Sequence, residues 1–196
     1  SKKVNAAIWK EVISTLKLAK AEPSLLMAVF ASAYFMFVAA FFQLNMIPFA
    51  VTTLGLTDIQ GGYLFCITAL GIGAGSVLAG LISGRDVELA LVPIGCAGIA
   101  AGCILTDYFA ADFSAIIPLV VLMGVFGGIY VIPLDSYIQM ASPKEYRGQV
   151  VAMGNFLSFV GVLVACLFLE VTSQHLGMLP NEAFLVVGTI SLCVGV

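Results

Sequence analysis

Long apolar stretches separated by short polar connections dominate the pattern of hydrophobic and polar positions along this chain. A helix needs about 20 apolar residues to cross roughly 30 Å of hydrocarbon. Runs of about this length occupy residues 25–52, 61–82, 89–105, 115–141 and 150–169, and another begins at 183. We therefore predict an all-α membrane protein with six spanning helices, the last of them truncated at Val196. Consecutive helices run antiparallel because the connections are too short to do otherwise.

The segment before the first apolar run has a helical pattern of its own. Apolar residues recur every four positions and lysines every seven, which places an apolar stripe and a basic stripe on one helix: Val4, Ile8, Val12 and Leu16, with Lys3, Lys10 and Lys17. We interpret residues 1–23 as a cytoplasmic amphipathic linker and residues 24–196 as the six-helix unit. The linker lies in the headgroup layer or simply joins two repeats.

The basic residues predict the orientation in the membrane. Of the eight Lys and Arg, five precede the first span, Arg85 lies between the second and third, and Lys144 and Arg147 lie between the fourth and fifth. Lys and Arg collect in cytoplasmic loops. Because all eight fall on one side of the predicted membrane, we expect the N-terminus to be cytoplasmic.

Composition supports a membrane setting and excludes several kinds of chemistry. The chain is 61% hydrophobic and 10% charged, whereas soluble domains carry about 25% charged residues. The five cysteines lie in apolar runs without metal-ligand spacing, so we expect buried thiols, no metal and no cofactor. No H-E-x-x-H, G-x-S-x-G or P-loop motif occurs. We expect neither an enzyme nor a nucleic-acid partner.

Small residues and prolines mark how the spans pack and bend. Glycines at short intervals allow close approach between helices; they are Gly71, Gly75, Gly80 and Gly84 in the second span, Gly95, Gly98 and Gly102 in the third, and Gly124, Gly127 and Gly128 in the fourth. Pro48, Pro93, Pro118 and Pro133 each lack a backbone donor and can bend a helix.

Polar residues inside the spans are the candidate functional residues. An acidic side chain at mid-bilayer costs roughly 2.5–3.5 kcal/mol on the mildest scale, so such residues usually have a role. The candidates are Gln43, Asn45, Asp135, Gln139 and Asn155, of which only Asp135 is charged. Each either contacts a polar substrate or serves a gate or structural hydrogen bond.

Two stretches resemble known transporters. Residues 80–86, GLISGRD, resemble the loop motif G-x-x-x-[DG]-R of the major facilitator superfamily. Residues 124–139, GVFGGIYVIPLDSYIQ, and 142–156, SPKEYRGQVVAMGNF, are similar to the second half of the bacterial lysophospholipid transporters. Members of that family occur alone or fused to an acyltransferase and an acyl-carrier-protein synthetase, and Asp135 stands where they often have Asn.

The resemblance implies helices seven to twelve of a twelve-helix fold in the bacterial inner membrane. A missing N-terminal half would then supply the other wall of a central cavity, and the two halves would rock about it. The loop motif and gate would comprise Gly80, Gly84, Arg85, Asp86, Pro133 and Arg147. The first, second, fourth and fifth spans would line the cavity or the interface between halves.

On this basis we expect a carrier that moves a lysophospholipid such as lysophosphatidylethanolamine to the inner leaflet. Its five polar candidates would contact the headgroup, and an apolar groove would hold the tail, with Phe35, Phe37, Phe41, Phe42 and Phe126. Two alternatives stay open. One is a proton-coupled carrier of a drug or small metabolite, and the other is a non-transporting membrane scaffold for a fused or docked acyltransferase.

Overall fold

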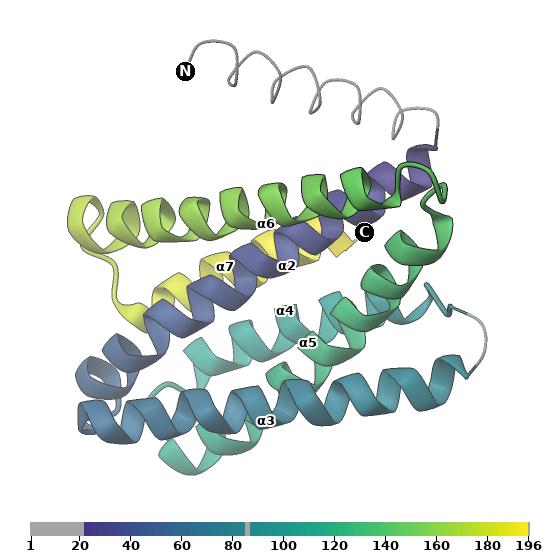
Figure 1. Cartoon of the computed structure of the whole chain (residues 1–196). Coiled ribbons are helices and arrows are strands. Elements are labelled where there is room, and N and C mark those ends of the chain that lie inside the picture. Colours follow the sequence, from purple (N-terminus) through teal and green to yellow (C-terminus); the bar gives the residue numbers. More distant parts are fainter. Residues whose placement is uncertain (1–21, 85–86, 196) are drawn as a thin grey trace.

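A computed structural model describes residues 22–84 and 87–195, and the regular secondary structure of this part of the chain consists of helices alone. The helices follow one another as α2 (Pro23–Pro48), η1 (Phe49–Thr53), α3 (Asp58–Ser83), α4 (Leu91–Tyr108), α5 (Phe113–Ala141), α6 (Arg147–Glu170), η2 (Val171–His175) and α7 (Pro180–Gly195) (Figure 1). Five helical segments are long and apolar enough to cross a membrane, and α7 is a shorter apolar helix. The all-α class is confirmed. The predicted linker, apart from residues 22 and 23, lies outside the described residues.

The apolar runs locate the helices well, but the connection predicted at residues 170–182 is wrong in extent. Helix α6 does not stop at Glu170; it continues as the π-helical turn η2 to His175. The turn is closed by backbone bonds from Leu176 N to Val171 O at 3.0 Å and from Met178 N to Thr172 O at 2.9 Å. Polar side chains therefore extend a helix here because a π turn pairs their backbone groups, which hydropathy alone does not reveal.

Helix α2 ends on the same side of the bundle, and it too continues into a π-helical turn, η1. Leu54 N bonds to Phe49 O at 3.3 Å and Leu56 N to Ala50 O at 2.9 Å, which closes η1. Each turn is followed by a glycine with positive φ, Gly55 at 67° and Gly177 at 63°. Only glycine enters this region without steric cost, so the two glycines end the helices.

Helices α2 and α6 form one pair, and α3 and α5 form another (Figure 1). Helix α4 packs against α5 and α7 and so closes the bundle behind both pairs. Because successive helices are antiparallel, all helix ends gather in two sets. We call them the Lys144 end, where α2 and α6 begin, and the Asp58 end, where α3 begins.

Close contacts between α3 and α5 confirm part of the predicted glycine packing. A Cβ atom built on Gly71 or Gly75 would collide with the backbone of α5 at Val121 or Val125, and one on Gly124 would collide with Thr68 O of α3. The absence of side chains lets two backbones approach closely, as in other membrane helix pairs. Glycine is therefore required sterically at the crossing of α3 and α5.

Glycines of α4 accommodate side chains of α5 in the same way. Gly95 faces Tyr130, Gly98 faces the ring of Phe126, and Gly102 faces Met123. The prediction is wrong for Gly80 and Gly84, where an added Cβ would meet nothing within 4 Å. Both are exposed near the end of α3.

An aromatic cluster joins α2 to α7 in the core. The ring of Phe184 lies 5.2 Å from that of Phe41, 5.1 Å from Phe42 and 5.4 Å from Phe49, all edge-on. This is a favourable aromatic geometry. Phe41 is fully buried, so it serves as core rather than as the wall of a groove.

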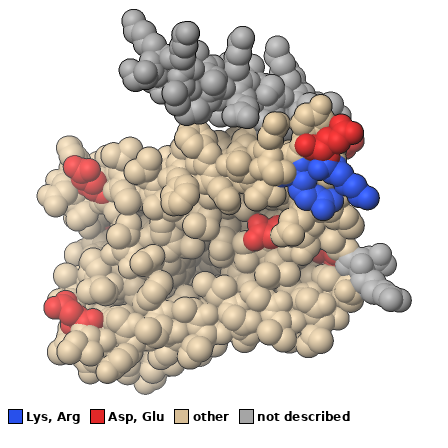
Figure 2. Space-filling view, in the orientation of Figure 1, with Lys and Arg blue, Asp and Glu red and all other residues tan. Residues whose placement is uncertain are grey.

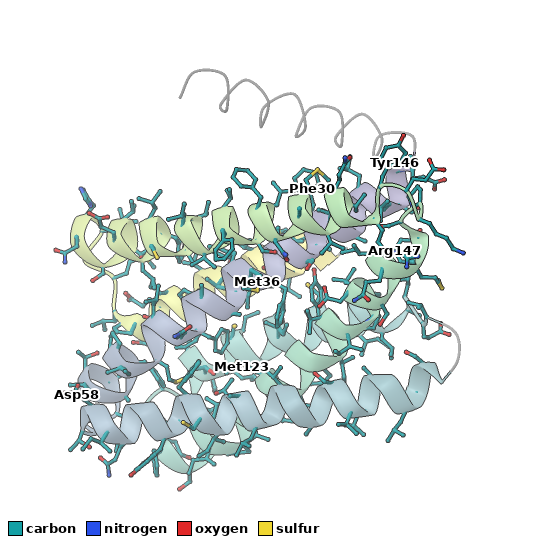
Figure 3. The ribbon with its side chains drawn as sticks, in the orientation of Figure 1. Phe30, Met36, Asp58, Met123, Tyr146 and Arg147 are labelled. Atoms are coloured by element: carbon teal, nitrogen blue, oxygen red, sulfur yellow. The ribbon has the colours of Figure 1, made fainter. Side chains whose placement is uncertain are left out.

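The charged groups lie mainly at the two ends of the helices. Figure 3 shows Asp58 at one end and Tyr146 and Arg147 at the other. Between them most of the surface in Figure 2 is neither acidic nor basic, and Lys and Arg atoms gather at one end. Lys144 and Arg147 thus lie at the end where α2 begins, as the loop pattern predicts. Arg85 and the five lysines before it lie outside the described residues.

Candidate substrate-binding face

Helices α3 and α6 are the spans least covered by the rest of the bundle. Each packs mainly on one neighbour, α3 on α5 and α6 on α2. Figure 2 shows a hollowed surface between the region of α6 above and that of α3 below. We call this side of the bundle, formed by α2, α3, α5 and α6, the open face.

Asp135 and Ser32 bring α5 and α2 together on the open face. Ser32 Oγ donates a hydrogen bond to Asp135 Oδ1 at 3.4 Å, although the two residues are 103 positions apart in the chain. Asp135 is exposed, and it lies between one and two turns before the end of α5 at Ala141. The carboxylate of Asp135 is therefore accessible from outside this bundle.

Two further polar residues lie on the same helix faces as Asp135 and Ser32. We call the four residues, Ser32, Gln43, Asp135 and Gln139, the polar strip. Gln139 follows Asp135 by four residues and is also exposed, so the two share a face of α5. Gln43 follows Ser32 by 11 residues, which is close to three full turns and about 16 Å along α2. Gln43 is exposed as well. The strip thus has polar groups at the Lys144 end and one further amide toward the Asp58 end.

An apolar cavity lies along this strip among α2, α3 and α5. Its volume is about 120 Å³, and its walls include Gln43 together with apolar and small residues. The residues lining it are Phe35, Val38, Ala39, Phe42, Phe65, Thr68, Ile72, Ile99, Met123, Gly124 and Gly127. Of the five phenylalanines predicted to line an apolar groove, only Phe35 and Phe42 border this cavity. Of the α2 residues that line the cavity, Phe35 lies nearest to Ser32, about one helical turn away.

Asn45 lies apart from the strip. It is 3% exposed, and its Nδ2 donates to the carbonyl of Pro180 at 2.9 Å. Next to this bond, Asn181 Nδ2 donates to Asp107 Oδ1 at 2.7 Å. The start of α7 is thereby fastened to both α2 and α4. In this structure the Asn45 amide joins two helices and is not available on the open face.

Asn155 is exposed on α6, two turns into that helix. Within the described part of the chain no hydrogen bond joins it to Ser32, Gln43, Asp135 or Gln139. Its position on α6 is compatible with a pathway bordered by the first and fifth spans.

The residues expected to form the loop motif and gate have different environments. Gly84 caps α3 with φ of 57°, and its N–H bonds to Gly80 O at 3.1 Å. Arg85 and Asp86 lie outside the described residues. Pro133 is buried inside α5, two residues before Asp135, and Arg147 is exposed at the first position of α6.

Ser32 is the residue of the site that sequence reasoning missed. Serine is common in membrane helices, so one hydroxyl in α2 gives little signal. Its helical phase with Gln43 was the available clue, and only the fold brings it to Asp135. A second unpredicted pair, Tyr34 and Ser191, shares a hydrogen bond of 2.6 Å between α2 and α7.

No cluster of three or more His, Cys, Asp or Glu that could hold a metal ion occurs among residues 22–84 and 87–195. All five cysteines are free; Cys96 and Cys103 are buried, whereas Cys66, Cys166 and Cys193 are exposed. The open face can therefore bind a ligand through hydrogen bonds, through the Asp135 carboxylate and through apolar contacts.

The described helices form a membrane-type bundle with one polar-lined face left open, an arrangement that suits transporters in which the substrate lies between two helical repeats. The family model described as Major Facilitator Superfamily matches residues 2–196. The chain therefore belongs to the Major Facilitator Superfamily, a family of secondary transporters. A comparison with curated protein sequences gives no match.

Proposed function

We propose that this chain forms one wall of a secondary transporter that carries a lysophospholipid, such as lysophosphatidylethanolamine, to the inner leaflet of a bacterial inner membrane. The observation that carries the proposal is the open face, where a polar strip runs beside an apolar cavity. An amphipathic substrate needs both, because its headgroup requires hydrogen bonds and its acyl chain does not.

The arrangement of the strip supports a headgroup site near the Lys144 end. Asp135, Ser32 and Gln139 offer a carboxylate, a hydroxyl and an amide within two turns of helix. The cavity that begins at Phe35 leads away from them toward the Asp58 end. A lysolipid can thus keep its headgroup polar contacts while its chain lies against apolar side chains. Gln43 is the remaining amide at the far end of this path.

A second six-helix half would supply the opposite wall. The spans α3 and α6, which the bundle itself leaves least covered, suit contact with such a partner. Substrate sites of this kind lie near the membrane midplane between two repeats that rock against one another. The resemblance of residues 124–156 to the lysophospholipid transporters favours the lipid substrate over a soluble one.

Uptake of labelled lysophosphatidylethanolamine by vesicles containing the full-length transporter tests the proposal. We expect the label to move from the outer to the inner leaflet faster than in vesicles without protein. Absence of lysolipid movement, together with transport of unrelated solutes by the same preparation, would reject the lipid assignment.

A proton-coupled carrier of a drug or small metabolite is the second candidate, and Asp135 is the observation that favours it. Membrane-embedded acids commonly serve as proton relays. This candidate predicts that Asp135→Asn transport no longer responds to a pH gradient, whereas lysolipid movement by our proposal does not require the gradient.

The third candidate, a non-transporting scaffold for a fused or docked acyltransferase, predicts that the protein transports nothing. It requires no polar strip on the open face, and vesicles containing the full-length protein would then move neither lysolipid nor any other solute.

A further inference from the structure

A second cavity lies at the Asp58 end of the bundle, away from the polar strip. Its volume is about 390 Å³, and cavities of about 300–1,000 Å³ are usual for small-molecule sites. Its walls come from the end of α2, from α6 and η2, and from the chain that leads from η2 into α7 (Figure 1). We call it the end cavity.

The amide of Asn45 presents an unpaired oxygen to the end cavity. Its Nδ2 donates to the carbonyl of Pro180 at 2.9 Å, and because a carbonyl only accepts, this bond fixes the orientation of the amide. Within residues 22–84 and 87–195 no hydrogen bond reaches Asn45 Oδ1. The oxygen is not sealed off, since Ser83 Oγ is the one fully enclosed side-chain oxygen or nitrogen without a partner in those residues. Asn45 is 3% exposed and lines the cavity, so Oδ1 opens onto it.

The polar groups with fixed roles in the end cavity are all acceptors. Among the residues that line it, all of them in the described part of the chain, Glu170 is the only charged one, and it is exposed at the end of α6. Thr172 Oγ1 donates to the carbonyl of Phe168 at 2.9 Å, so it can only accept from a ligand. The cavity therefore favours a ligand that donates hydrogen bonds and carries positive charge.

Apolar side chains complete the walls. Leu44, Leu169 and Leu179 line the cavity, and Leu44 and Leu179 are exposed. Cys166 lies one turn before Glu170 on α6, so the cavity extends from its charged rim toward the middle of the helices. Covering exposed apolar surface is favourable, so the ligand needs an apolar part as well as a donor.

We propose that the end cavity binds an organic ammonium with an apolar body, such as an alkylamine. An ammonium group has three donors and no acceptor, which matches acceptors supplied by both α2 and α6, and its charge offsets that of Glu170. An alkyl carboxylate would bring a second negative charge beside Glu170, and an alcohol brings one donor and no charge.

This site is separate from the open face. Gln43 and Asn45 are two residues apart, so their side chains point about 200° apart around α2; Gln43 borders the cavity of the open face and Asn45 the end cavity. The inference therefore does not depend on the proposed transport of lysophospholipid.

Protection of Cys166 from alkylation tests the inference, because this exposed thiol lines the end cavity. The protein is the full-length transporter in lipid nanodiscs with its other native cysteines replaced. The probes are octylamine, octanol and octanoate, which share a chain length, and octylamine is charged at neutral pH as a lysine side chain is. Octylamine should slow the reaction of Cys166 with a neutral maleimide, at an affinity about tenfold above that of octanol, or about 1.4 kcal/mol. Octanoate should protect least.

Two controls identify the cause of the protection. Glu170→Gln should lower the affinity for octylamine to that for octanol. Asp58→Asn should keep the full preference, since it removes a carboxylate from the same end of the bundle but outside the cavity. In a protein that keeps only Cys66, exposed on α3 and not part of the cavity wall, octylamine should leave the reaction rate unchanged.

The inference is overturned if octylamine does not slow the reaction of Cys166, or if all three probes protect equally, since the alkyl chain alone would then bind. A Cys166 that never reacts would overturn it too, because the cavity would be closed in the whole protein. Equal effects of Glu170→Gln and Asp58→Asn would also reject it, since general surface charge would then explain the preference. None of these results changes the outcome expected for lysolipid transport, so the two proposals fail separately.

Discussion

At the scale of single residues, two amides in α2 that look alike in the sequence have different environments. Gln43 and Asn45 are two positions apart, and both interrupt an apolar run. A shift of two residues turns the side chain by about 200° around a helix. Gln43 therefore faces outward along the polar strip, whereas Asn45 faces inward to Pro180 of α7.

Replacing Asn45 with Ala should destabilise the bundle, because the hydrogen bond from α2 to the Pro180 carbonyl at the start of α7 is lost. Hydrogen bonds between membrane helices are worth about 0.6 kcal/mol on average and up to about 1.7 kcal/mol. We expect Asn45→Ala to lower the thermal unfolding midpoint of the full-length protein in detergent.

Gln43→Ala is the matched control, since it removes an exposed amide from the same helix. It should leave the midpoint unchanged. Equal midpoints for both variants would show that the Asn45 bond does not stabilise α7 against α2.

The sequence identifies the polar residues inside the apolar spans but not the residues that they contact. The cost of a polar group in hydrocarbon singles out Asp135, Asn45 and Gln139 without any knowledge of the fold. Which of them faces a neighbour depends on contacts between distant segments, such as Ser32 with Asp135. No local pattern encodes a pair that is 103 residues apart.

At the scale of helices, close packing of α3 against α5 depends on glycines of both. The backbone carbonyl of Val125 occupies the space that a Cβ on Gly75 would need. A collision with backbone cannot be relieved by a side-chain rotation, so the helices would have to move apart.

Gly75→Ala should destabilise the α3–α5 contact by roughly 1–3 kcal/mol, the usual cost of overpacking. The measurement is again the thermal midpoint of the full-length protein. Gly73→Ala serves as the control on the same helix because nothing lies within 4 Å of its added Cβ. If Gly73→Ala lowers the midpoint as much as Gly75→Ala, the close approach is not what holds these helices together.

Hydropathy predicted the existence of every described helix, and its errors are confined to helix ends. The turn η2 was missed because polar residues such as Thr172 and Ser173 lie in a π-helical turn, whereas most of η1 falls within the predicted run 25–52. Hydropathy could not predict that α2 pairs with α6 and α3 with α5, because every apolar run is an equally suitable neighbour for any other. Glycine spacing gave the one usable hint, and it was right for Gly71 and Gly75 but not for Gly80 and Gly84.

At the scale of the whole molecule, the distribution of charge predicts the orientation. Lys144 lies at the end where α2 begins, and Ser173 is exposed at the opposite end. Positive charge collects on the cytoplasmic side. In a full-length protein without its native cysteines, we expect an impermeant maleimide to label Ser173→Cys in intact cells.

Lys144→Cys should react with the same reagent only after the membrane is permeabilised. Labelling of Lys144→Cys, but not Ser173→Cys, in intact cells would reverse the proposed orientation and place the N-terminus outside.

The central claim is that the open face lines a substrate pathway and does not simply contact lipid. Accessibility of Gln139→Cys to a water-soluble thiol reagent tests it most directly, in a full-length transporter whose native cysteines have been replaced. Ile94→Cys, exposed on α4 outside the open face, is the control. We predict that Gln139→Cys reacts, that lysophosphatidylethanolamine slows its reaction, and that Ile94→Cys stays unreactive. An unreactive Gln139→Cys, or a reaction rate unchanged by lysolipid, would contradict the account.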